Sequence, residues 1–139
     1  ARLTKQVRIQ AKYERSLEVL ARLSNAGIKS KSGIMLGLGE TEEEIIEALK
    51  DLRKSEVKIL TLGQYLQPTP KHLPVARFVH PDEFEMFREE GYKMGFDHVE
   101  SGPLVRSSYH AEKHLKKNLY VSFKEGNFTL FFYGLIYYY

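Results

Sequence analysis

The chain has 139 residues, enough for one domain, and it contains no cysteine, which excludes disulfides, a thiol nucleophile and any iron–sulfur cluster held by its own thiolates. Its formal net charge of +3 comes from residues 113–139, because residues 1–112 hold 17 basic and 17 acidic side chains, so no basic face for nucleic acid is indicated. No apolar run reaches the roughly 18 residues of a membrane-spanning helix, so we expect a soluble chain that binds neither nucleic acid nor a membrane.

The first half of the chain predicts a helix, a strand and a second helix. Leucine and alanine residues recur at helical spacing over residues 13–26, and Gly27 is suited to end that helix. The apolar run 34–36 predicts a strand that ends at a glycine turn. Thr41 and Glu44 then have the spacing of a capping box, which predicts the start of the next helix.

The second half repeats this order of elements. Residues 58–62 predict another strand, and a long loop with three prolines follows it. A helix is expected to open after Pro81, at about Asp82, and to end at Gly95. A third strand is predicted over residues 98–101.

Strands that alternate with helices in this way predict an α/β fold made of parallel βα units with right-handed crossovers. Binding groups in such units gather beyond the carboxyl ends of the strands. Three strands cannot close a barrel of eight. Either sequence missing at the N-terminus completes the sheet, or the chain is a small open α/β domain. Glycine and polar residues follow each predicted strand, namely Gly37, Gly39 and Glu40, then Gly63, Gln64 and Tyr65, then Gly102 and Arg106.

Three segments in order, KSGIMLGLGETEEE, LTLGQYLQPTPKHLPV and GPLVRSSYHAEK, resemble successive blocks of the lipoyl synthase family of radical S-adenosylmethionine enzymes. The resemblance covers roughly residues 2–115. It implies that residues 1–115 are the C-terminal part of a partial βα barrel that includes the RSSY segment. Residues 116–139 are an aromatic tail to which the family pattern does not extend, and the sequence leaves open whether it is an evolved segment or a read-through or frame-altered end.

The resemblance implies a sulfurtransferase that inserts two sulfur atoms into the octanoyl group of a lipoyl-carrier protein. It also implies S-adenosylmethionine and two [4Fe–4S] clusters as cofactors of the full enzyme. Both cysteine motifs of the family lie upstream of the matched region, so we expect a cysteine-bearing N-terminal region to be missing here. The chain alone is then expected to be inactive and to bind no cofactor stably. The expected location is the cytoplasm of a bacterial-type cell, with an organelle as the alternative.

The RSSY segment holds the candidate reactive residues. By resemblance, Ser108 is a ligand of the cluster that donates sulfur, and Arg106, Ser107 and Tyr109 are candidate catalytic residues. A serine oxygen is a hard ligand for iron that prefers thiolates, so it releases its iron more readily than cysteine would. The alternatives are a helix N-cap for the serine pair and a surface salt bridge for Arg106.

Candidate cofactor-binding residues lie mostly in the first two blocks. The glycines allow a backbone to approach a ligand closely, but an ordinary βα turn would have the same pattern. An amide and a ring after the second strand are candidates for contact with adenine, and two basic residues are candidates for the cofactor carboxylate. These residues are Gly33, Gly37, Gly39, Glu40, Gln64, Tyr65, Arg8 and Lys31.

Two other function classes remain open from the sequence. The main rival is a non-catalytic α/β module that binds a small, nucleotide-like molecule, in which the RSSY turn only caps a helix. A nucleic-acid binder is third, because the charge over residues 1–112 is balanced.

Overall fold

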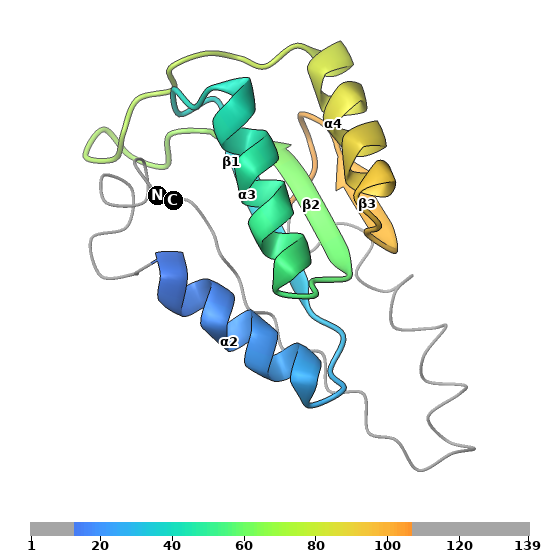
Figure 1. Cartoon of the computed structure of the whole chain (residues 1–139). Coiled ribbons are helices and arrows are strands. Elements are labelled where there is room, and N and C mark those ends of the chain that lie inside the picture. The colour runs from blue at the N-terminus through green and yellow to red at the C-terminus, as the bar shows by residue number, and fades with distance from the viewer. Residues whose placement is uncertain (1–12, 107–139) are drawn as a thin grey trace.

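The computed structural model of the chain describes residues 13–106, which form a three-stranded parallel sheet and three helices (Figure 1). The predicted α/β class is therefore confirmed for this part of the chain. Residues 107–115 and the aromatic tail 116–139 lie outside the described residues. In chain order the elements are α2 (Tyr13–Asn25), β1 (Lys31–Leu36), α3 (Glu42–Lys54), β2 (Ile59–Gln64), α4 (Pro81–Lys93) and β3 (His98–Ser101).

The local sequence signals locate the helix starts well. The side chain of Thr41 accepts a hydrogen bond from the Glu44 amide at 3.3 Å, and the Glu44 carboxylate accepts one from the Thr41 amide at 3.0 Å. This is the predicted capping box, and α3 begins directly after Thr41. Pro81 stands at the first position of α4, where its missing amide proton costs no helical hydrogen bond.

β3 matches its predicted range, whereas the start of β1 and the ends of β2 differ from the predictions because pairing, not hydrophobicity alone, defines them. β1 begins at Lys31, three residues before the predicted strand, since Lys31 pairs with Ile59 in the parallel ladder. β2 continues to Gln64, which pairs with Leu36, although the prediction ended it at Leu62. Glycine and polar residues therefore extend both strands beyond their apolar centres.

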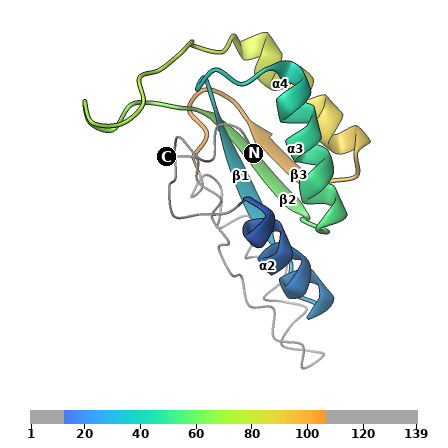
Figure 2. The same cartoon turned by 60° about the vertical axis from the view of Figure 1, so that its left-hand side comes forward.

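The helices cover one face of the sheet, as Figure 2 shows for α3 and α4 beside the strands. Alternate strand residues point to this face and form the core with the helices. Leu20 of α2 and Leu49 of α3 are almost fully buried there. The sheet side chains of this core are Ile34, Leu36, Leu60, Leu62 and Val99.

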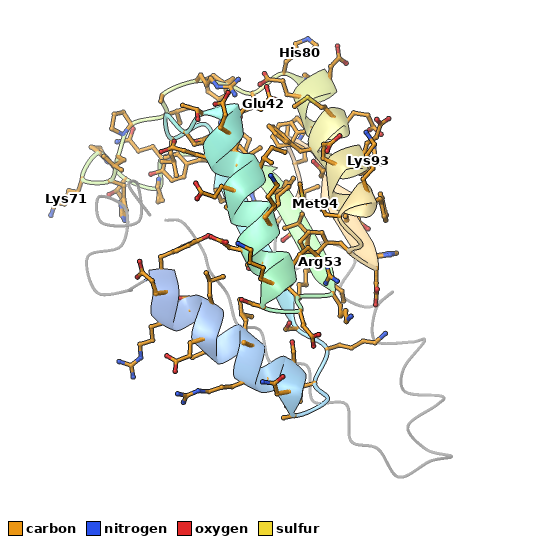
Figure 3. The ribbon with its side chains drawn as sticks, in the orientation of Figure 1. Glu42, Arg53, Lys71, His80, Lys93 and Met94 are labelled. Atoms are coloured by element: carbon orange, nitrogen blue, oxygen red, sulfur yellow. The ribbon has the colours of Figure 1, made fainter. Side chains whose placement is uncertain are left out.

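The strand order is β1-β2-β3, and both neighbouring pairs are parallel. All three strands therefore end at the same edge of the sheet, called here the carboxyl edge. Figure 3 shows Glu42 and His80, at the beginnings of α3 and α4, at this same edge. Arg53 and Met94 lie at the opposite edge, where Arg53 Nε donates to the Met94 carbonyl at 3.3 Å.

Candidate functional site

The turn after β1 is stabilised by hydrogen bonds to the carboxylate of Glu40, the residue at its end. Both Glu40 oxygens accept backbone hydrogen bonds, from the Gly37 amide at 2.6 Å and from the Leu38 amide at 2.8 Å. Gly37 and Gly39 have φ angles of 101° and 97°, a region that glycine adopts without strain. Glu40 therefore shapes this turn.

The backbone approach that Gly37 permits is an approach to the next loop of the same chain. A Cβ atom at Gly37 would lie 2.4 Å from the Arg77 carbonyl oxygen and 2.4 Å from Gln64 Nε2. The Gly37 carbonyl also accepts hydrogen bonds from the amides of Ala76, at 2.8 Å, and Arg77, at 3.4 Å. The turn after β1 and the end of the loop before α4 are therefore in direct contact.

Side-chain hydrogen bonds of Gln64 and Tyr65 fasten the long loop between β2 and α4. Gln64 Nε2 donates to the carbonyls of Tyr65, at 3.0 Å, and Arg77, at 3.1 Å, and Gln64 Oε1 accepts from the Val79 amide at 2.8 Å. The Tyr65 hydroxyl donates to the Leu73 carbonyl at 2.9 Å, and burial raises the pKa of this hydroxyl. Tyr65 as a whole is only 1% exposed.

The outer part of this loop stands away from the sheet, and Figure 3 shows Lys71 at its far end. Residues 66–72 are all exposed. Hydrogen bonds inside the loop order it: Gln67 Nε2 donates to the His72 carbonyl at 2.8 Å, and Thr69 Oγ1 lies 2.8 Å from His72 Nδ1. The loop is thus anchored at its base and ordered at its tip.

The turn after β3 crosses the face of the sheet opposite the helices. Gly63 alternates with the core residue Leu62, so it points to that opposite face. A Cβ atom at Gly63 would lie 2.3 Å from the Val105 carbonyl oxygen. Arg106 Nη1 donates to the same oxygen at 2.8 Å and to the Pro103 carbonyl at 3.3 Å. The segment Gly102–Arg106 therefore lies over the carboxyl end of β2.

An ion pair between Arg77 and Glu83 lies at the carboxyl edge, beside the start of α4. Arg77 donates from both terminal nitrogens to the two Glu83 oxygens, each at 2.8 Å. The hydrogen bond to Glu83 raises the pKa of Arg77, and the nearby carboxylates of Glu83 and Glu40 act in the same direction. The hydrogen bond from Arg77 in turn lowers the pKa of Glu83. Arg77 and Glu83 thus form a pair of opposite charges at this edge near Glu40.

The structure brings most of the described candidate residues together at the carboxyl edge. These are the turn residues Gly37, Gly39 and Glu40, the loop anchors Gln64 and Tyr65, and Arg106. Their polar side-chain atoms bond mainly to the protein itself. The Gln64 amide and the Tyr65 hydroxyl support the loop, and their contact with adenine stays a prediction.

Two candidates on β1 lie away from that edge. Lys31 is the first residue of the strand and is buried, with 7% of its surface exposed. Gly37 lies six positions further along the chain, which is about 20 Å in an extended strand. Gly33 lies in the middle of β1, where a Cβ atom would meet Thr61 Oγ1 at 2.6 Å. Gly33 therefore allows close packing between neighbouring strands. The other candidates, Arg8, Ser107, Ser108 and Tyr109, lie outside the described residues.

Two residues that shape this edge were not among the candidate site residues: Gly63, which the sequence placed only at the end of a strand, and Arg77. A signal for Gly63 was present, because glycine inside a strand often marks the close approach of another backbone. Arg77 gave no such signal, since its partner Glu83 is defined by the course of the loop.

The chain's own residues do not fit an iron–sulfur cluster. Thiolates normally hold such clusters, and the sequence has no cysteine. In the part of the chain that the structure describes, no three histidine, aspartate or glutamate side chains gather at metal-binding distance. No helix in that same part is long and apolar enough to span a bilayer.

Comparisons with known proteins give one matching family model and several similar proteins of known name. A family model described as the radical SAM superfamily matches residues 2–52. A lipoyl synthase from Flavobacterium psychrophilum is 65% identical over 115 residues, which is 82% of this chain and 40% of that protein. A mitochondrial lipoyl synthase from Nematostella vectensis is 64% identical over the same shares. Over its matched part, the chain is therefore similar at high identity to proteins named lipoyl synthase.

The similarity to lipoyl synthases is high but covers a limited share of those proteins. A lipoyl synthase from Bacteroides fragilis is 56% identical over 117 residues, which is 84% of this chain and 41% of that relative. The chain thus spans about 40% of the length of the curated lipoyl synthases that it matches. The described strands and helices are consistent with part of a radical S-adenosylmethionine α/β fold.

Proposed function

We propose that this chain is a segment of a lipoyl synthase-like sulfurtransferase, which inserts two sulfur atoms into a protein-bound octanoyl group. The partner is then an octanoylated lipoyl-carrier protein, and the full enzyme uses S-adenosylmethionine and two [4Fe–4S] clusters. Identity of 56–65% to proteins named lipoyl synthase supports this proposal. The enzyme works in the cytoplasm or, as the name of the Nematostella vectensis relative suggests for that protein, in mitochondria.

The position of the turn after β3 is the observation that carries the proposal. This turn crosses the carboxyl end of β2 above Gly63. The RSSY segment therefore starts, at Arg106, beside that strand end. The turn after β1, with Gly37 and Glu40, lies at the same edge. Ligands of parallel α/β sheets bind at this edge, so the two family segments meet where such a ligand is expected.

We place the three strands in a partial βα barrel whose remaining strands lie outside this sequence. The face opposite the helices would then point into the barrel, and the carboxyl edge would bind the cofactor. In this proposal the turn Gly37–Glu40 lies against S-adenosylmethionine, and Arg8 is the preferred partner for its carboxylate because Lys31 starts the strand at the far edge. Gly33 packs the sheet behind this site.

Ser108 is proposed as a ligand of the cluster that donates sulfur, and cysteines from outside this sequence supply the other ligands. Arg106, Ser107 and Tyr109 are proposed to contact the substrate or the same cluster. The Arg106 side chain donates to two backbone carbonyls of its own turn, those of Pro103 and Val105. These hydrogen bonds fix the start of the RSSY segment. The isolated chain is expected to insert no sulfur.

The test uses a chimera in which residues 1–115 replace the matching segment of the Flavobacterium psychrophilum lipoyl synthase. If Ser108 is a cluster ligand, Ser108→Ala abolishes the lipoyl product while cleavage of S-adenosylmethionine, which depends on the other cluster, persists. Thr41→Ala is the matched control, because it removes a known helix cap and so costs about 1 kcal/mol of stability without loss of sulfur insertion. Full lipoyl product from Ser108→Ala would return Ser108 to a capping role. A chimera that never yields lipoyl product would contradict the proposed function itself.

A further inference from the structure

Gln64 is a buried polar residue whose side chain joins two segments far apart in the sequence. It is the last residue of β2, it is 4% exposed, and it pairs with Leu36 at the end of β1. Its register with the core residues Leu36 and Leu62 places its side chain on the helix-facing side of the sheet. The amide is therefore turned away from the open face of the sheet.

Every polar atom of this side chain has a protein partner. Nε2 donates to the carbonyls of Tyr65 and Arg77, and Oε1 accepts from the Val79 amide. A primary amide has two protons to donate, so both donors of Gln64 are used within the protein. Loss of these bonds would leave buried backbone groups of the loop without partners, which is more costly than loss of an exposed hydrogen bond.

The loop that Gln64 fastens is also bonded to the turn after β1. Ala76 and Arg77 donate to the Gly37 carbonyl, and the absent Cβ of Gly37 leaves the space that Gln64 Nε2 and the Arg77 carbonyl fill. On its other side, Gly37 donates to Glu40. A continuous set of hydrogen bonds thus connects Gln64, the loop end and the glycine turn.

We infer that Gln64 is a positioning residue, which ties the loop end Ala76–Val79 to the turn Gly37–Glu40 and so fixes the backbone of that turn. The inference rests on the proposed function, in which this turn lies against S-adenosylmethionine. Gln64 then affects binding of this cofactor without touching it. A turn that is already ordered loses less conformational freedom when a ligand binds, so the protein binds that ligand more tightly.

Gln64→Met tests this role, because methionine is close to glutamine in shape but cannot form the three hydrogen bonds. Gln67→Met is the matched control: Gln67 also donates from its amide to a loop carbonyl, that of His72 at 2.8 Å, but at the exposed tip and away from Gly37. Gln64→Glu is a second variant, which keeps the acceptor for the Val79 amide and lacks the two donors.

The first measurement is amide hydrogen exchange of the chain itself at Gly37 and Leu38. Neither amide bonds to Gln64, since both donate to Glu40, so faster exchange there reports a loosened turn. We expect amide exchange to be at least about tenfold faster in Gln64→Met, because local opening of the turn becomes easier when about one to two net hydrogen bonds are lost. Exchange in Gln67→Met should be unchanged. Unchanged exchange at Gly37 and Leu38 in both Gln64 variants would overturn the inference.

The second measurement is the kinetics of S-adenosylmethionine cleavage in the chimera. A positioning role predicts that Gln64→Met raises KM for S-adenosylmethionine about tenfold while kcat changes by less than about twofold, with Gln67→Met like the parent. A purely structural role would instead lower the amount of folded enzyme and leave KM unchanged, and that result would overturn the inference. If the parent chimera does not cleave S-adenosylmethionine, the proposed function fails, and the exchange data still decide whether Gln64 holds the turn.

Discussion

Replacement of Gly63 by alanine is expected to disturb the start of the RSSY segment. Gly63 lies on the face opposite the helices, and a Cβ atom there would stand 2.3 Å from the Val105 carbonyl oxygen. Ordinary van der Waals contact begins near 3.4 Å, so the two groups must separate by about 1.1 Å, the difference between these distances. The Cβ atom would also lie 3.2 Å from Met35 Sδ, but a methionine side chain can move aside more easily than a backbone carbonyl.

The energetic cost follows from this overlap. Insertion of a methyl group into a packed region typically costs about 1–3 kcal/mol, and loss of a glycine offsets about 0.4–1 kcal/mol of that through the unfolded chain. We therefore expect Gly63→Ala to lower the free energy of unfolding by roughly 1–2 kcal/mol. The shift would also move the acceptor of Arg106, which donates to the Val105 oxygen at 2.8 Å.

Thermal unfolding followed by circular dichroism measures this effect in the chain itself. A loss of 1 kcal/mol lowers Tm by about 4–8 °C in a folded unit of 60–100 residues. Gly102→Ala is the matched control from the same turn, because its Cβ atom would lie 3.6 Å from Val105 Cγ2, an ordinary contact. We expect that control to change stability by less than about 0.5 kcal/mol. Equal Tm values for Gly63→Ala and the parent chain would show that the Val105 carbonyl does not lie over Gly63.

Three further predictions concern capping, pH and metal content. Thr41→Ala removes the acceptor for the Glu44 amide and should cost about 1 kcal/mol in chemical denaturation, whereas Glu42→Ala, in the same first turn, should cost less. The hydrogen bond from Arg77 lowers the pKa of Glu83 in the folded protein. The ionised Glu83 therefore stabilises the fold fully above the ordinary carboxyl pKa, and this contribution is lost as the pH falls through the lowered pKa of the folded state. Stability measured between about pH 5 and pH 3 should therefore fall less in Glu83→Gln than in the parent chain, and equal slopes would contradict this ion pair. Anaerobic reconstitution of the chain should leave no chelator-resistant iron and sulfide, and a stoichiometric cluster would show that ligands other than cysteine suffice.

The local order of the elements could be read from the sequence because short-range chemistry decides it. The capping box at Thr41, Pro81 at the start of α4 and the left-handed Gly27 after α2 all act over a few neighbouring residues. The RSSY and GQYLQP motifs likewise predicted the similarity to lipoyl synthases that the comparisons found. The absence of cysteine showed that the chain cannot hold an iron–sulfur cluster through thiolates of its own.

Tertiary structure decided what the glycine and polar residues of the carboxyl edge contact. The glycine at position 37 predicted a close backbone approach, and only the fold shows that the loop end at Arg77 occupies the position of a Cβ atom there. Gln64 and Gly63 are neighbours in β2, yet one faces the helices and the other faces the turn after β3, because strand residues alternate between faces. Such contacts depend on where distant segments return to the sheet, and no local pattern in a single sequence specifies that.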